Sequence, residues 1–180
     1  MAEREAAASA LLRSGEVLLI ERAEREGDPW SGHVALPGGF RRPSETLLEA
    51  AVRETLEEVG VDLRGVEPLA VLGPFRSRLD PGLRVFLFAF PFPGGDPVPG
   101  PEVRSVFWIP LGSVSRTEVV SLPGVGRVEG CPVGGRVIWG LTLRMLRALL
   151  EVLGGRPDAA LLIDQPRVVR LIPRGAPRRS

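Results

Sequence analysis

The chain is short of several residue types on which common protein classes depend. Its 180 residues contain one Cys, one His and no Tyr, and no apolar run is long enough for a membrane helix. A single Cys cannot form an internal disulfide, and one Cys with one His cannot complete a four-ligand zinc site. These absences exclude disulfide scaffolds, structural zinc modules and membrane-spanning proteins, and we expect a cytoplasmic protein.

An excess of either charge is also missing. The chain has 23 Lys+Arg against 22 Asp+Glu, a formal net charge of +1. Nucleic-acid or membrane-surface binding needs a basic excess on one face, so we predict neither partner. The first residues carry acids where a signal peptide has a basic start. The length and a hydrophobic content of 44% suit one domain with a sizeable core.

Apolar runs and turn residues predict a mixed α/β domain. The predicted strands are Val17–Ile20, Val66–Phe75, Val85–Phe90 and Val103–Ile109, and the predicted helices are Glu45–Val59 and Trp139–Leu153. Pro91–Pro101 is predicted as a loop, and Ser113–Gly135 as irregular with a hairpin around Pro123-Gly124 and Gly130-Cys131-Pro132. We assign residues 1–155 to the domain and residues 156–180 to a C-terminal extension, either a docked strand or a loose basic tail.

The helix Glu45–Val59 carries the most informative pattern in the chain. Ser44 is the predicted N-cap and Gly60 the stop. Helical spacing places one apolar set toward the core: Leu48, Val52, Thr55, Leu56 and Val59. It places three acids on the exposed side: Glu54, Glu57 and Glu58. Carboxylates three and four residues apart repel, which predicts a cation between them.

Oxygen ligands without nitrogen or sulfur favour Mg²⁺ or Mn²⁺, ions that usually act on phosphate substrates. The turn Pro37-Gly38-Gly39 precedes the helix and can bring backbone groups close to such an ion. The helix N-terminus adds donors suited to a phosphate oxygen. Loop and helix together predict a site for phosphoryl chemistry.

The residues from Gly39 to Val61 read G-x5-E-x7-R-E-U-x-E-E-x-G-U, where U is apolar or Thr. This pattern resembles the signature of the Nudix hydrolase family. The resemblance implies an α/β/α sandwich with a mixed β-sheet and a catalytic loop-helix-loop. It also implies hydrolysis of a nucleoside diphosphate linked to another group, by water activated with Mg²⁺ or Mn²⁺.

The family's roles transfer onto the matching positions of this chain. The resemblance makes Glu54, Glu57 and Glu58 the metal ligands, with the carbonyl of Gly38 or Gly39 as a further ligand. Arg53 would orient a carboxylate, and Glu45 would brace the loop against the helix. Glu102 is our candidate for an additional acid that serves as the base, the alternative being an ordinary loop carboxylate.

Other residues near the expected cleft are candidates for substrate contacts. Arg22 would contact a phosphate or end a strand at the surface, Trp30 would stack on a base, and Gly38 and Gly39 would approach the substrate. The family resemblance also allows a homodimer whose interface the C-terminal helix or tail would supply.

Outside the Gly39–Val61 pattern, the chain is similar to the coenzyme A diphosphatase subgroup. The matching segments are Leu18–Ala23, Gly32–Gly39, Glu102–Leu111 and Ile138–Arg144. The chain has Ile20, Asp28 and Leu36 where the subgroup has Thr, Arg and Phe. ADP-ribose, NADH, a dinucleoside polyphosphate or a nucleoside triphosphate is therefore an alternative substrate to coenzyme A. A non-catalytic Nudix module that senses a ligand is the other alternative.

Overall fold

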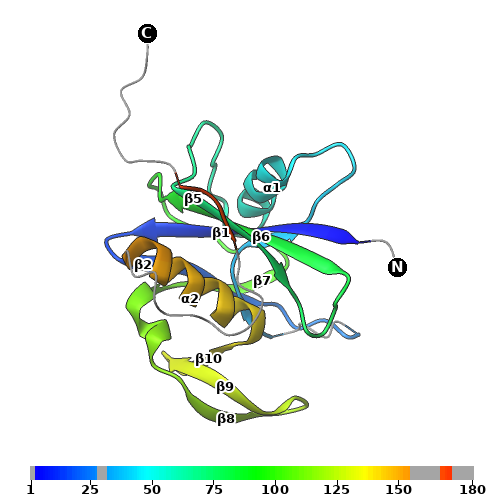
Figure 1. The fold of residues 1–180 in the computed structure, drawn as a ribbon, viewed down its shortest axis with the longest axis vertical. Coiled ribbons are helices and arrows are strands. Elements are labelled where there is room, and N and C mark those ends of the chain that lie inside the picture. The colour runs from blue at the N-terminus through cyan, green and yellow to red at the C-terminus, as the bar shows by residue number, and fades with distance from the viewer. Residues whose placement is uncertain (1–2, 28–31, 155–166, 172–180) are drawn as a thin grey trace.

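Strands and two long helices follow one another in the computed structural model, which describes residues 3–27, 32–154 and, as backbone, 167–171 (Figure 1). The strands before the first helix are β1 (Arg4–Arg13), β2 (Glu16–Arg22), β3 (Val34–Ala35) and β4 (Gly38–Phe40). Helix α1 (Leu47–Val59) is followed by β5 (Ala70–Arg76), β6 (Leu83–Pro91), β7 (Val103–Pro110) and the short 3-10 helix η1 (Leu111–Ser115). The remaining elements are β8 (Glu118–Leu122), β9 (Gly126–Val133), β10 (Arg136–Trp139), α2 (Gly140–Gly154) and β11 (Arg167–Leu171).

The larger sheet is mixed, with the strand order β11-β5-β6-β1-β2-β3. Strand β1 runs parallel to β6, whereas β2 pairs antiparallel with β1, β3 and β7. Strand β4 pairs with the first half of β1, so the loop before α1 is joined directly to the sheet. The mixed sheet confirms the predicted α/β class.

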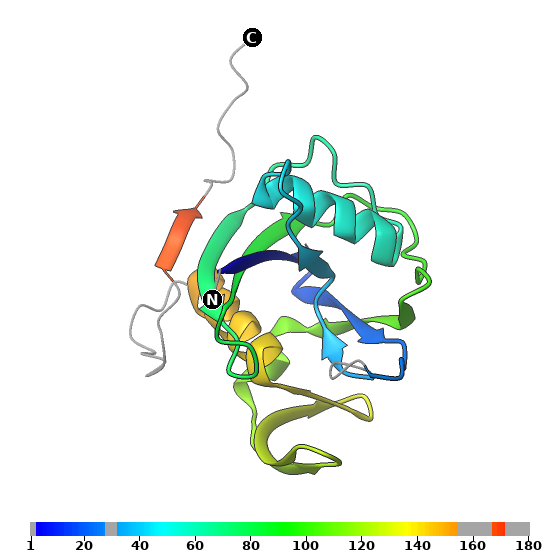
Figure 2. The same cartoon turned by 90° about the vertical axis from the view of Figure 1, so that its right-hand side faces the viewer.

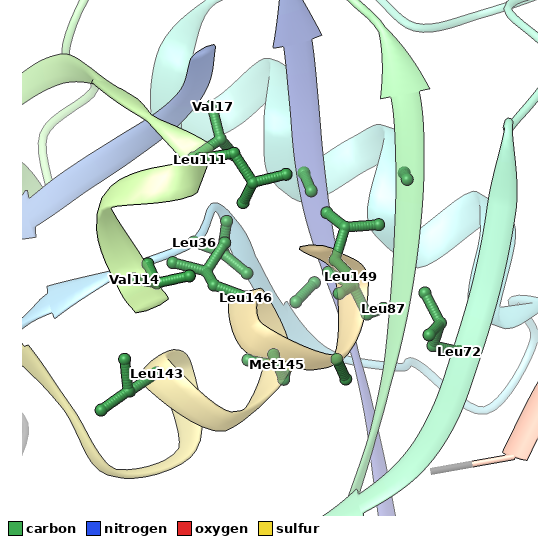
Figure 3. Close-up of a cluster of buried hydrophobic side chains, with 14 of the residues drawn as sticks. Val17, Leu36, Leu72, Leu87, Leu111, Val114, Leu143, Met145, Leu146 and Leu149 are labelled. Carbon is green, nitrogen blue, oxygen red and sulfur yellow. The ribbon is translucent and has the colours of Figure 1, made fainter. Parts of the chain in front are cut away.

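The two helices lie on opposite faces of this sheet (Figure 2). One core, under α2, contains the buried residues drawn in Figure 3, among them Leu72, Leu87, Leu146 and Leu149. The other core packs Ala50, Ala51 and Val59 of α1 against β1, β2 and β6. The helices on both faces confirm the α/β/α sandwich.

Strand β1 has no counterpart among the predicted strands. Its sequence is rich in Ala, which has low β-propensity, and it shows no alternation because both of its faces are covered. The small side chains allow a close approach of the neighbouring backbone: a Cβ on Gly38 would overlap the carbonyl oxygen of Ala7. The central strand is therefore recognisable only once its neighbours are in place.

Two other predictions need correction. The strand predicted from Val66 begins at Ala70, since Pro68 has no N–H for a ladder and Gly65 has a positive φ of 77°. Residues 113–135 are not irregular, because η1 and the strands β8 and β9 lie there, and β10 completes a second, three-stranded sheet. The hairpin turn predicted at Pro123-Gly124 is present between β8 and β9, but Gly130-Cys131-Pro132 lies within β9 and forms no turn.

The C-terminal part is described only in β11, which pairs antiparallel with β5. Residues 156–166 and 172–180 lie outside the described residues, so the division of the chain at residue 155 stays a prediction. Within the described ranges, none of the helices has the length and apolarity needed to cross a membrane.

Candidate active site

Helix α1 begins two residues later than predicted. Its N-cap is Thr46, not Ser44: the Thr46 hydroxyl accepts from Glu49 N–H at 3.1 Å, and the Glu49 carboxylate accepts from Thr46 N–H at 2.7 Å. This reciprocal capping box satisfies two backbone donors and outcompetes the earlier serine. Glu45 therefore lies in the loop before the helix. Gly60 ends the helix in the left-handed conformation, as predicted.

The buried face of α1 also differs from the prediction. Thr55 and Val59 are buried as expected, but Leu48 and Leu56 are 39% and 45% exposed. Ala50, Ala51 and Glu58 take their place on the inner face. Small residues let the helix approach β1 closely, where the Thr55 hydroxyl donates to Ala51 O at 2.7 Å and lies within hydrogen-bond distance of the Ser9 hydroxyl, at 2.8 Å.

Arg53 connects the loop to the acids of the helix. Its guanidinium contacts Glu45 twice, through Nε at 2.5 Å and Nη2 at 3.0 Å, and Nη2 also donates to the carbonyl of Phe40 at 3.1 Å. Nη1 donates to Glu54 at 2.7 Å and to Glu57 at 3.4 Å. The hydrogen bonds from Arg53 lower the pKa of Glu45 to about 2, so this pair stays ionised.

Glu58 is the acid whose surroundings differ most from the prediction. It was predicted to be exposed, but it is 5% exposed and its carboxylate accepts a hydrogen bond from Gly38 N–H at 3.0 Å. The pKa of Glu58 is raised to about 8, chiefly by burial and in smaller part by the charges of Glu54 and Glu102, while the Gly38 hydrogen bond and the charge of Arg22 oppose this rise. A carboxylate with a raised pKa beside other acids is typical of a site that receives a cation.

The Gly38-Gly39 turn lies between β1 and the acids. A Cβ on Gly39 would overlap the Glu54 carboxylate, just as one on Gly38 would overlap β1. At Gly38 the overlap is with backbone and requires glycine, whereas a side chain at position 39 would displace the Glu54 carboxylate from the turn. The turn thus brings backbone groups against Glu54 and Glu58.

Glu102 and Arg22 come to the same region from distant parts of the chain. Both act electrostatically on Glu58, Arg22 lowering its pKa and Glu102 raising it. Glu102 also forms an exposed ion pair with Arg25 at 3.1 Å, and its carbonyl accepts from Ala23 N–H at 3.0 Å. Trp30 lies outside the described residues, so its predicted stacking role stays a prediction.

The donor set has the chemistry of a hard-cation site. In the part of the chain that the structure describes, no three acidic, His or Cys side chains are already gathered around an ion position. Glu54 is instead held by Arg53, and Glu58 by Gly38 N–H. The groups that meet the glycine turn here are nevertheless carboxylates of α1, so the residues fit Mg²⁺ or Mn²⁺.

Sequence reasoning missed one contact that supports the loop. Arg41 donates to Glu5 of β1 at 3.0 Å and to the carbonyl of Glu45, also at 3.0 Å. Glu5 is 36 residues away, and no local pattern links it to the loop. In the sequence, the basic pair Arg41-Arg42 beside the glycine turn is the only feature that points to this contact.

Comparison with known proteins decides the family. A sequence model of the NUDIX domain matches residues 3–123. The chain belongs to the Nudix hydrolase family. It is 31% identical to the Nudix hydrolase NudL of Yersinia pestis over 152 residues, which cover 78% of this chain and 74% of the relative. It is 40% identical to a Schizosaccharomyces pombe protein over 105 residues, 53% of this chain and about a third (32%) of the relative.

Solved Nudix structures share the fold. A Nudix hydrolase from Nitrosomonas europaea is 27% identical, with a TM-score of 0.52, and the match covers 62% of each chain. A MutT/Nudix family protein from Enterococcus faecalis has a TM-score of 0.55 at 21% identity and covers 86% of this chain and 63% of that one. These matches confirm the Nudix fold that the Gly39–Val61 pattern predicted.

Proposed function

We propose that this Nudix hydrolase cleaves the diphosphate bond of a nucleoside diphosphate linked to another group, with Mg²⁺ or Mn²⁺ as its cofactor. One observation carries the proposal: Arg53 and the Gly38-Gly39 turn converge on the acids of α1, and the buried Glu58 lies among them with a raised pKa. Such an arrangement is of little use to a structural helix, because burying a carboxylate is costly.

The residues divide the work as follows. Glu54, Glu57 and Glu58, with the carbonyl of Gly38, would hold the cation. A bound cation lowers the pKa of a water molecule and neutralises charge on the phosphoryl oxygens.

Other residues orient the cation ligands, bind the substrate and accept the proton. Arg53 keeps Glu54 and Glu57 in place while Glu45 anchors it to the loop. Arg22 binds a phosphate oxygen. Glu102 accepts the proton from the attacking water, a role supported by the hydrogen bond from Ala23 N–H to its carbonyl, which holds residue 102 beside Arg22.

Coenzyme A or a derivative is the proposed substrate. Support comes from the segments that are similar to the coenzyme A diphosphatase subgroup, because β2 pairs with both β3 and β7 and so places three of these segments side by side. Of the three departures, Ile20 and Leu36 are buried in the two cores and leave the charge of the cleft unchanged. Asp28 lies outside the described residues.

The test is mass spectrometry of the products after incubation with Mg²⁺ or Mn²⁺ and a panel of coenzyme A, NADH, ADP-ribose, diadenosine polyphosphates and nucleoside triphosphates. Preferential cleavage of coenzyme A to adenosine 3',5'-bisphosphate and phosphopantetheine is the expected result. Preference for another compound would retain the chemistry and reject the substrate. No cleavage by a folded sample would favour a ligand-sensing module. Light scattering on the same sample tests the predicted homodimer.

A further inference from the structure

Prolines alternate with other residues between Pro97 and Pro101, in the segment that leads to Glu102. We call residues 97–101 the proline strap. Proline has no N–H, so Val98 and Gly100 supply the only backbone amide donors of the strap. Both are used on the last turn of α1: Val98 N–H donates to Val59 O at 2.9 Å, and Gly100 N–H donates to Glu58 O at 2.8 Å.

These bonds satisfy two of the last carbonyls of the catalytic helix. The last carbonyls of a helix have no partner within it. Gly60 N–H satisfies Leu56 O at 3.0 Å, and the strap satisfies those of Glu58 and Val59. Each proline also restricts the residue before it to extended conformations, so the strap has few alternatives to the conformation that reaches the helix.

Gly100 is the point of closest approach. A Cβ at this position would overlap the carbonyl oxygen of Glu57, a backbone atom that cannot swing aside. Any larger residue must therefore push the strap and the last turn of α1 apart. That turn carries Glu57 and Glu58, two of the acids assigned to the cation.

Backbone hydrogen bonds also hold the C-terminal end of the strap. Val103 N–H donates to Gly100 O at 3.1 Å, and Glu102 O accepts from Ala23 N–H at 3.0 Å, next to Arg22. The backbone at Glu102 is therefore held between the strap and Ala23, and its carboxylate is paired with Arg25. Its charge acts on Glu58, which places the two carboxylates within electrostatic reach of each other.

We propose that the proline strap fixes Glu102 relative to Glu57 and Glu58, and that Gly100 is the positioning residue that sets this separation. The inference rests on the proposed function, because it assigns the strap to the same reaction. It adds a residue that touches neither cation nor substrate and acts through Glu102.

The first test compares Gly100→Ala with Gly112→Ala. A Cβ on Gly112 has no atom within 4 Å, so this variant is the matched control. We expect Gly100→Ala to lower kcat about 100-fold with little change in KM, because small misplacements of reacting groups have effects of that order. Gly112→Ala should match the wild type. Equal kcat in the two variants would overturn the proposal.

A double-mutant cycle separates positioning from general damage. If Gly100 acts through Glu102, the variant Gly100→Ala/Glu102→Gln should be no slower than Glu102→Gln alone, and both should lose the same limb of the pH–rate profile. Multiplying losses would show that Gly100 acts independently of Glu102 and would reject the positioning role.

Two further measurements cover other outcomes. If Gly100→Ala does not fold, Pro99→Ala/Pro101→Ala loosens the strap without steric overlap, and we expect kcat to fall about fivefold; an unchanged kcat contradicts the proposal. If the wild type cleaves no diphosphate, the proposed function has failed, and crystal structures of the two variants still test the strap. The Glu102 carboxylate should then be displaced relative to Glu57 and Glu58 in Gly100→Ala and not in Gly112→Ala, and an unchanged separation in both rejects the strap as a positioning device.

Discussion

Helices α1 and α2 cover opposite faces of one sheet but are built on different principles. Helix α2 buries large side chains, including Leu143, Leu146 and Leu149. Helix α1 buries Ala50, Ala51, Thr55, Glu58 and Val59. Its large residues Leu48 and Leu56 instead line an open groove with Leu63 and Val66. A helix that only packs against the core buries its large side chains. A helix that carries a site buries small residues, which allow close backbone contacts, and a side chain of the site itself.

The largest expected effect is the loss of turnover when an acid of α1 is neutralised. Glu57→Gln or Glu58→Gln should each lower kcat by about 1000-fold or more, because each removes a proposed cation ligand. The far-ultraviolet circular dichroism should not change. Glu151→Gln, on α2, is the control and should retain full activity. Near-normal turnover in either α1 variant would refute the site and erase the contrast between the helices.

The pH dependence of stability distinguishes the buried acid of α1 from an ordinary surface acid. The pKa of Glu58 is raised from 4.5 to about 8, so between these values the metal-free native protein holds a proton that the unfolded chain has released. The free energy of unfolding should therefore fall as pH rises through this window, by at most about 5 kcal/mol. Urea denaturation at a series of pH values, with a metal chelator present, measures this fall in the free energy of unfolding.

Glu58→Gln is the control for that experiment, since it cannot titrate and should not show this component of the decrease. Added Mg²⁺ should stabilise the wild type at the upper end of the window, because a cation favours the charged carboxylate. Identical pH profiles for the wild type and Glu58→Gln would contradict the burial of this acid.

Truncation of leucines sharpens the comparison of packing. Leu146 of α2 is fully buried, and Leu146→Ala should lower the free energy of unfolding by about 2–5 kcal/mol. Leu56→Ala on the outer face of α1 is the matched change and should cost about 0.5 kcal/mol or less. Chemical denaturation of both variants measures the difference. Equal losses would mean that the outer face of α1 is packed after all.

The smallest effect concerns the polar contact between α1 and β1. Thr55→Val keeps the shape of the side chain but removes the hydroxyl that is hydrogen-bonded to Ala51 O and Ser9 Oγ. It should cost about 1–2 kcal/mol, the usual cost of a lost buried hydrogen bond. Ser9→Ala should cost less, because Thr55 keeps its bond to Ala51. A higher free energy of unfolding for Thr55→Val than for the wild type would show that this contact is not needed to hold α1 against β1.

Much of the site was predictable because its spacing is local. Glu45, Arg53 and the three acids have positions set by helical periodicity and by a short loop, and their mutual contacts follow from that spacing. The N-cap was misplaced by two residues because both Ser44 and Thr46 are good caps, and only Thr46 has Glu49 three residues later. The three-stranded sheet was missed because its glycines and prolines indicate turns but not how the strands between them pair.

The register of the acids, the glycine turn and the family follow from the sequence alone, since these depend on short, covalently linked stretches. The folded chain was needed to show which side of α1 is buried, that the Ala-rich β1 lies within the sheet, and that Glu102 and Glu58 lie within electrostatic reach of each other. Periodicity defines the faces of a helix but not which face meets a neighbour. That choice depends on the shape and charge of segments far away in the chain, which come together only when the sheet forms.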